Sequence, residues 1–161
     1  MRKIFAFLLT FIMALSTTCV AFAGEQTAAG NSHPVEYTYF EDGSYIVTTI
    51  TEEPAVSFAR AGNTKTGSKT SKYYSSSGTA MWYVTVNGTF SYNGSTATCT
   101  NASVTAGSYS ASWKINSKSS KHSGSSASGI AKATMYDTYG NYVKSATKTV
   151  TLTCSKTGTL S

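Results

Sequence analysis

The chain has 161 residues, of which 40% are hydrophobic and 12% charged, and its formal net charge is +6 at pH 7. That length suits one domain with a hydrophobic core of its own. Only two histidines and seven carboxylates are present in the whole chain, so there is little material for acid–base catalysis or metal binding.

The N-terminal segment, residues 1–23, is typical of a signal peptide. It has a basic start at residues 2–3, an apolar centre at residues 4–15, and the cleavage pattern Ala-Phe-Ala at residues 21–23. A membrane anchor needs about 20 apolar residues, and this centre is shorter. We therefore expect a secreted, extracellular protein whose mature chain begins at Gly24 and has no membrane span.

The predicted elements begin with a flexible lead-in over residues 24–36, which are mostly small and polar. Residues 37–54 are predicted to form an acidic hairpin around the loop Glu41-Asp42-Gly43. Residues 61–70 contain mainly Gly, Thr, Lys and Ser and are the best candidate for a linker. Together with the strands that follow, these segments form a single predicted domain, residues 37–161.

The densest run of large apolar residues after the signal segment lies at residues 81–99. These side chains share the even positions, which is the period of a half-buried strand: Trp82, Val84, Val86, Phe90 and Tyr92. Two Asn-Gly pairs compete for the following hairpin turn. A turn at Asn87-Gly88 would send Phe90 to the opposite face from Trp82, so the turn is predicted at Asn93-Gly94. In that register Gly88 lies within the strand, opposite Cys99.

The remaining elements follow from alternation and turn residues. Apolar residues alternate with polar ones at 109–115, which predicts a strand, and residues 117–124 are predicted to form a polar loop containing His122. Small apolar residues share one face of a predicted strand at 127–135, and residues 137–141 form a turn by composition. The last strand has an apolar face that ends at Cys154.

This pattern predicts an all-β fold, an antiparallel β-sandwich. The order Cys99, Trp113, Cys154 also matches the Cys…Trp…Cys order of immunoglobulin domains, but Leu152 stands where those domains have a tyrosine. The expected sandwich is therefore immunoglobulin-like at most in architecture. The two mature cysteines predict a disulfide in an exported protein, and two buried free thiols are the alternative.

Charge is divided unevenly along the mature chain. Residues 24–54 hold six carboxylates and no Lys or Arg, whereas residues 55–161 hold eleven Lys or Arg and one carboxylate. The division suggests an acidic segment against a basic surface, or a basic body for a polyanion. We favour a simpler interpretation of the basic residues, in which scattered lysines keep a β-protein soluble. They are too dispersed to indicate a nucleic-acid partner.

Catalytic residues are hard to assemble from this chain. His33 lies in the lead-in, His122 in a predicted loop, and Asp137 in a predicted turn. No metal-binding spacing, phosphate loop or nucleophile motif is present. We therefore expect a protein that is not an enzyme and needs no cofactor.

The candidate ligand surface consists of exposed aromatic and basic residues: Tyr73, Tyr74, Tyr83, Lys72 and Lys114. Tyrosines beside lysines can bind glycans or anionic polymers. The plainer interpretation is that tyrosine pairs stabilise the surface of a sheet. Candidate partners are an anionic cell-wall polymer, a glycan or another protein.

Three segments carry a resemblance to other proteins: Tyr39-Phe40-Glu41-Asp42-Gly43-Ser44-Tyr45, Gly88-Thr89-Phe90-Ser91-Tyr92-Asn93-Gly94 and Leu152-Thr153-Cys154. They are similar to small exported proteins of Gram-positive bacteria that have no assigned activity. The resemblance implies a secreted bacterial origin and no active-site residues.

Two functions are compatible with these features. The first is a non-enzymatic β-sandwich that acts as an extracellular binding module. The second is a secreted precursor of a bacteriocin-like basic effector, masked by its acidic N-terminal segment and released by cleavage between Arg60 and Lys72. Pairing of the acidic hairpin into the sheet favours the first, because its removal would expose a strand edge.

Overall fold

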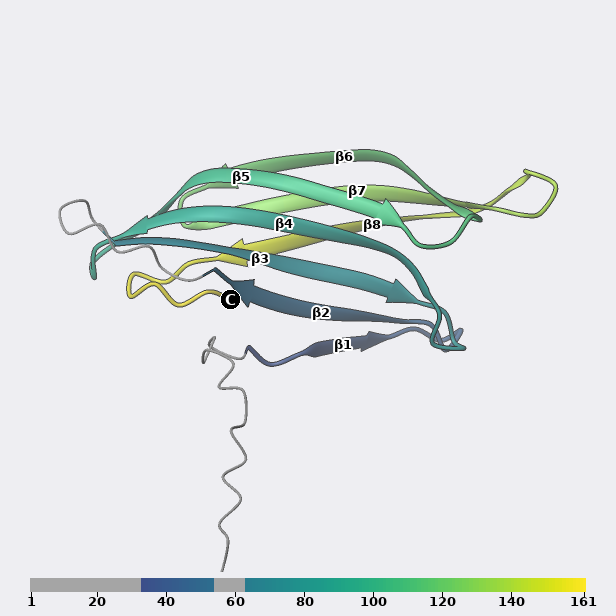
Figure 1. Ribbon diagram of the computed structural model, residues 1–161, viewed down its shortest axis with the longest axis horizontal. Coiled ribbons are helices and arrows are strands. Elements are labelled where there is room, and N and C mark those ends of the chain that lie inside the picture. Colours follow the sequence, from purple (N-terminus) through teal and green to yellow (C-terminus); the bar gives the residue numbers. More distant parts are fainter. Residues whose placement is uncertain (1–32, 54–62) are drawn as a thin grey trace, which may run out of the picture.

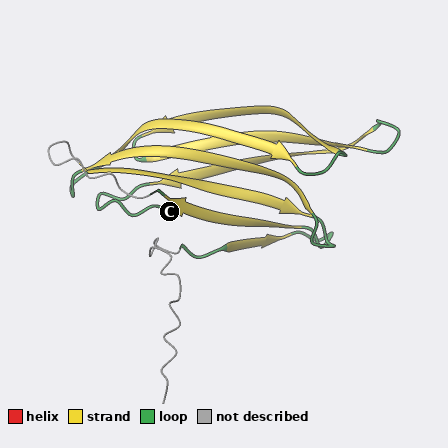
Figure 2. Cartoon of the chain, viewed as in Figure 1, coloured by secondary structure: helices red, strands yellow, loops and turns green. Residues whose placement is uncertain are grey.

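Eight strands and no helix make up the part of the chain that the computed structural model describes, residues 33–53 and 63–161 (Figures 1 and 2). They form two antiparallel sheets, sheet A and sheet B. Sheet A contains β1 (Glu36–Tyr39), β2 (Tyr45–Glu52), β3 (Asn63–Tyr74), β4 (Ala80–Tyr92) and β5 (Ala97–Ser108), and sheet B contains β6 (Trp113–Ser123), β7 (Ser126–Tyr136) and β8 (Tyr142–Thr153). The predicted signal peptide and most of the lead-in lie outside the described residues.

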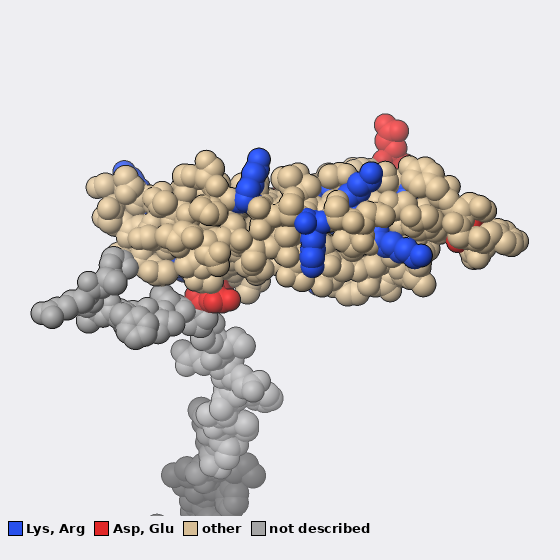
Figure 3. Space-filling model, turned by 90° about the horizontal axis from the view of Figure 1, so that it is seen from above, with Lys and Arg blue, Asp and Glu red and all other residues tan. Residues whose placement is uncertain are grey.

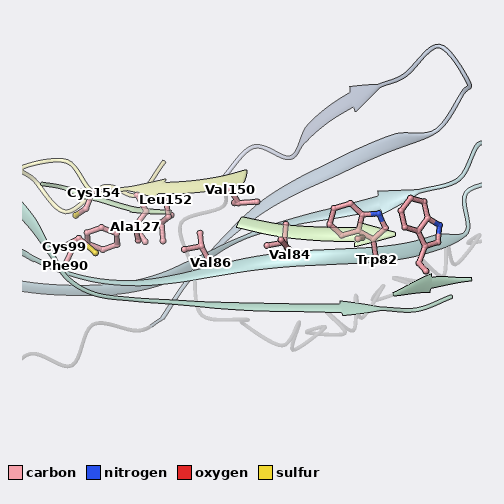
Figure 4. Packing of buried hydrophobic residues seen from close by; sticks show 13 residues of the cluster. Trp82, Val84, Val86, Phe90, Cys99, Ala127, Val150, Leu152 and Cys154 are labelled. Atoms are coloured by element: carbon pink, nitrogen blue, oxygen red, sulfur yellow. The ribbon is translucent and has the colours of Figure 1, made fainter. Parts of the chain in front are cut away.

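The predicted all-β, antiparallel sandwich is confirmed. Within each sheet every strand pairs with its neighbour in the chain, so the order contains no crossover. This topology differs from the Greek-key connections of immunoglobulin domains. Trp113 packs against Trp82, with ring centres 6.1 Å apart, whereas Cys99 and Cys154 lie at the opposite end of the core beside Phe90 (Figure 4). The immunoglobulin arrangement of a tryptophan on the cysteine pair is therefore absent.

The core forms where large residues of β4 face small residues of β7. The even-numbered apolar positions of β4 face the core as predicted, with Trp82 2% exposed, Phe90 fully buried and Tyr92 partly buried. The facing alanines of β7 are also fully buried. A Cβ atom at Gly88 would stand 2.7 Å from the Phe90 ring and 3.1 Å from Cβ of Ala127. Gly88 is therefore required for the close approach of the two sheets.

The β4–β5 hairpin turns where it was predicted, but with a different register. Tyr92 pairs with Ala97, and Cys99 faces Phe90 rather than Gly88. The predicted two-residue turn is a four-residue loop, because the Asn93 side-chain oxygen accepts hydrogen bonds from the N–H groups of Ser95 and Thr96, at 3.0 and 2.9 Å. The side chain of Asn93 thus holds a wider loop than the dipeptide alone predicts.

Two segments predicted to be irregular are strands. The linker prediction at 61–70 is wrong from Asn63 onward, since β3 begins there and pairs with both β2 and β4. The loop prediction at 117–124 is also wrong, because β6 continues through Ser123, with His122 opposite Ala127 of β7. Both segments contain mainly Ser, Thr and Lys, so neither shows the apolar alternation on which strand prediction depends.

Sheet A is wider than sheet B. Residues 36–52 form a hairpin whose strand β2 pairs with β3 along eight residues, so the acidic segment belongs to sheet A. Sheet B packs against β3, β4 and β5, and its strands leave β1 and β2 without a facing strand (Figure 1). At one end of this open side the C-terminal segment folds back, and the buried side chain of Leu160 occupies the space over Gly67.

Candidate ligand-binding face

Three of the five predicted ligand-binding residues lie on the outer face of sheet A. Side chains alternate between the faces of a strand, and Trp82 and Val84 of β4 point into the core. Tyr83 between them therefore points outward, and its partner across β3 is Lys72. Tyr74, two residues beyond Lys72, shares this face.

The other two predicted residues are elsewhere. Tyr73 points inward, where its ring lies 6.2 Å from Trp82 and meets Trp113 edge-on at 5.7 Å. Lys114 lies on β6 of the other sheet, with its ammonium 5.2 Å from the centre of the Tyr136 ring. The predicted five-residue surface is therefore split, and only Lys72, Tyr74 and Tyr83 remain together.

Two tyrosines absent from the predicted set extend this face. Tyr39 of β1 lies opposite Tyr45 of β2, which in turn lies opposite Tyr74 of β3. The ring centres are 5.6 Å apart in the first pair and 5.0 Å apart in the second, and the second pair is parallel to within 7°. These three residues form a tyrosine row across one end of sheet A. Tyr39 is 71% exposed, so the row is open to solvent at the β1 edge.

The rest of the outer face carries rows of short polar side chains, which we call the hydroxyl rows. Each row crosses β2, β3, β4 and β5 at directly paired positions. The first contains Thr49, Thr70, Thr85 and Thr105, and the second contains Thr51, Ser68, Asn87 and Ser103. Thr70 and Thr85 share a hydrogen bond of 2.8 Å between their hydroxyl groups. Each hydroxyl both donates and accepts, so the rows suit a ligand that is itself rich in hydroxyl groups.

Charge separates the two outer faces of the sandwich. Among the outward positions of the described strands of sheet A, Lys72 is the one charged residue. Sheet B presents Lys114, Lys121 and Lys132 at its outward positions. In the view of Figure 3 the lysines stand apart from one another, separated by uncharged residues. The outer face of sheet A is therefore nearly neutral, aromatic at one end and hydroxyl-bearing over the rest.

The groups considered for catalysis are dispersed. His33 bonds to the carboxylate of Glu52 at 2.8 Å, whereas His122 is exposed on β6. The Asn141 side chain and neighbouring N–H groups donate to Asp137, which lowers the pKa of that carboxyl. Asp137 thus holds its own turn together. Among the described residues no group of three or more His, Cys, Asp or Glu is placed to hold a metal ion.

Cys99 and Cys154 lie on either side of the β6–β7 turn. Both are buried free thiols in the structure, and burial raises the pKa of each. The Cys99 N–H donates to the carbonyl of Gly124 at 2.7 Å, and the Cys154 N–H donates to the carbonyl of Ser125 at 3.0 Å. The structure shows no bond between the two sulfur atoms, which agrees with the alternative of two buried free thiols, and the predicted disulfide stays a prediction.

Comparison with protein-family models, curated proteins and solved structures found no match. The described residues contain no helix long and apolar enough to cross a membrane.

Sequence reasoning missed Tyr39, Tyr45 and the hydroxyl rows. These residues could have been found only from the register of the β1–β2 and β2–β3 pairs, which places tyrosines from three strands side by side.

Proposed function

We propose that this protein is a secreted, non-enzymatic binding module that holds a neutral glycan on the outer face of sheet A. The observation that carries the proposal is that the tyrosine row and the hydroxyl rows lie on the same face, which has one charged side chain on its described strands. Sugar rings present C–H groups that pack on aromatic rings, and their hydroxyl groups bond to Thr, Ser and Asn side chains.

A neutral glycan fits this face better than a polyanion. Binding of a polyanion depends mainly on clustered Lys and Arg, and Lys72 is the one Lys or Arg at the outward positions of the described strands of sheet A. The broad face of paired strands also suits a ligand longer than one sugar. The hydroxyl rows extend over four strands, so an extended chain can contact several rows together.

The masked-effector alternative is less compatible with the sheet. Ile46 of β2 is 7% exposed and belongs to the core, and Asp42 in the β1–β2 turn forms an ion pair with Lys144 of β8 at 3.6 Å. Cleavage between Arg60, which lies outside the described residues, and Lys72 would remove β1 and β2 and cut into or next to β3. The product would expose a long strand edge. The arrangement therefore favours the binding module with its acidic hairpin in place.

Binding to insoluble polysaccharides tests the proposal. The purified protein is incubated with cellulose, with chitin and with peptidoglycan from which anionic polymers have been removed, and the unbound fraction is measured. We expect binding to at least one of them. The double variant Tyr45→Ala/Tyr74→Ala should bind about tenfold more weakly or worse, since each lost ring contact is worth roughly 1 kcal/mol.

Tyr139→Ala/Tyr142→Ala is the matched control, because both rings are exposed in the β7–β8 region, 89% and 65% respectively. This control should bind like the unchanged protein. The proposal is wrong if no polysaccharide is bound, or if the two double variants lose the same affinity. Melting curves of both variants separate loss of the surface from loss of the fold.

Secretion and the disulfide are the remaining parts of the proposal, and they rest on the signal-like residues 1–23 and on the burial of both cysteines. Intact-mass spectrometry of protein from native culture medium tests both. We expect a chain starting at Gly24 whose mass rises by about 2 Da on reduction, as for one S–S bond. A chain starting between Ala61 and Tyr73 would instead support the masked effector.

A further inference from the structure

The open side of the sandwich contains a cleft between the two sheets, which we call the edge cleft. Its floor is the inner face of β1–β3, and its opposite wall is β8. One cavity of about 160 Å³ is lined by Glu36, Thr48, Lys69, Ser71, Lys148 and Thr151, among others. A second cavity of about 360 Å³ shares Glu36, Lys69 and Thr151 with the first. The two cavities therefore adjoin.

Two lysines from opposite sheets line the smaller cavity. Lys69 of β3 and Lys148 of β8 are both half-buried. Within the described chain the ion pairs are His33–Glu52, Lys65–Glu52 and Asp42–Lys144. Neither Lys69 nor Lys148 belongs to one of them. Both lysines therefore line this cavity without an ion pair to a described carboxylate.

The neighbouring lysine on the same face shows what Lys69 lacks. Lys65 also points inward from β3, and it forms an ion pair with Glu52 at the end of β2. The residue of β2 opposite Lys69 is Ile50, which offers no charge. An external anion can supply the partner that β2 supplies to Lys65.

Hydroxyl groups complete the lining. Thr48 and Ser71 are 8% and 2% exposed and hydrogen-bond to each other at 2.8 Å. Thr151 of β8 also lines the cavity, but its hydroxyl group bonds to Ser128 on the outer face of sheet B at 3.0 Å. Glu36 of β1 is the one carboxylate that lines the smaller cavity among the described residues. Lysines from both sheets and hydroxyl groups from sheet A thus line the space, and a single negative group opposes an incoming anion.

We propose that the edge cleft binds a phosphate group between Lys69 and Lys148. A phosphate offers several oxygen acceptors around one centre, so it can receive hydrogen bonds from lysines on both walls and from the hydroxyl groups between them. The larger cavity next to it leaves room for a group attached to the phosphate. The source is either free phosphate or a phosphodiester of a polymer. This site is separate from the outer face of sheet A, and neither proposal depends on the other.

Calorimetric titration of the full chain at constant ionic strength tests the proposal. The first probe is inorganic phosphate and the second is a soluble glycerol-phosphate oligomer. Binding of either supports the site and names the source, and absence of binding to both overturns it. Lys69→Gln and Lys148→Gln should each weaken binding about tenfold, because each removes a charged hydrogen-bond donor.

Three further variants keep the result specific. Lys69→Arg retains the charge and should retain binding, which separates loss of the site from loss of the fold. Glu36→Gln removes the opposing carboxylate and should strengthen binding severalfold. Lys132→Gln, on the outer face of sheet B, should leave affinity unchanged. The proposal is wrong if Lys132→Gln weakens binding as much as Lys148→Gln, because the effect would then be general attraction to a basic protein. Unaltered binding in the Tyr45→Ala/Tyr74→Ala protein would show that the two sites are independent.

Discussion

The inner and outer faces of sheet A are built from the same strands by alternate residues, yet they follow different rules. On β4, Val84 and Val86 are fully buried, whereas Thr85 between them is partly exposed and bonds sideways to Thr70. The inner face is shaped by the opposing sheet, so the size of each side chain matters there. The outer face meets solvent, so its composition is free to serve a ligand. A substitution should therefore affect stability on one face and binding on the other.

A substitution at Gly88 is the strongest test of this difference between the two faces. A valine there would place methyl groups where the Phe90 ring and Ala127 already lie, and the sheets cannot separate locally without losing their packing. We expect Gly88→Val to lower the free energy of unfolding by about 3 kcal/mol, at the upper end of overpacking effects. Urea denaturation followed by tryptophan fluorescence measures the change.

Thr89→Val is the matched control on the next residue. Thr89 points to the outer face and is partly exposed, so the same side chain introduced there should change stability by no more than about 0.5 kcal/mol. Equal destabilisation by the two variants would contradict the assignment of the faces. A protein that tolerates Gly88→Val fully would show that the sheets are farther apart than the contacts at Gly88 imply.

The two Asn-Gly pairs show how far sequence reasoning reached. Alternation identified the buried face of β4 and excluded a turn at Asn87-Gly88, because parity along one strand is a local property. Asn93-Gly94 was correctly chosen, and Gly94 has the positive φ of 86° that such a turn requires. The register beyond it was wrong by two residues at Tyr92 and, past a bulge at Thr89 and Phe90, by three at Gly88, which pairs with Ala102. The length of the loop depends on hydrogen bonds to the Asn93 side chain, which dipeptide statistics do not specify.

The candidate site was predictable only in part, for a related reason. Adjacent tyrosines at 73 and 74 point to opposite faces, so a set that includes both cannot form one surface. The hydroxyl rows come from strands up to about sixty residues apart in the chain, and their alignment depends on three registers at once. Asn63–Thr70 of β3 was taken for a linker because its inner face carries Lys65 and Lys69 instead of apolar residues. These lysines are tolerated because β3 borders the open side of the sandwich, where Lys65 pairs with Glu52 and Lys69 lines a cavity.

This uncovered part of the inner face is the exception to the first comparison, since it is polar and partly charged. Glu52 is at its edge, with only 7% of its side chain exposed, and it pairs with Lys65 and His33. Burial acts to raise the pKa of Glu52, but the hydrogen bonds and charges of Lys65 and His33 outweigh it, so the pKa is lowered overall. The carboxylate is thus more stable in the folded protein than in the unfolded chain.

The resulting stability has a defined dependence on pH. Because the pKa of Glu52 is lower in the folded state, its contribution is present above the unfolded value of about 4.3 and is lost as pH falls through the folded value. Glu52→Gln should lower the free energy of unfolding by about 2 kcal/mol at neutral pH, and its stability should decline less than that of the unchanged protein on acidification from about pH 5 to about pH 3. Glu53→Gln is the adjacent control, because the exposed Glu53 side chain forms no ion pair within the described chain. If both variants keep the acid dependence of the unchanged protein, the open side of the sandwich is not held by this ion pair.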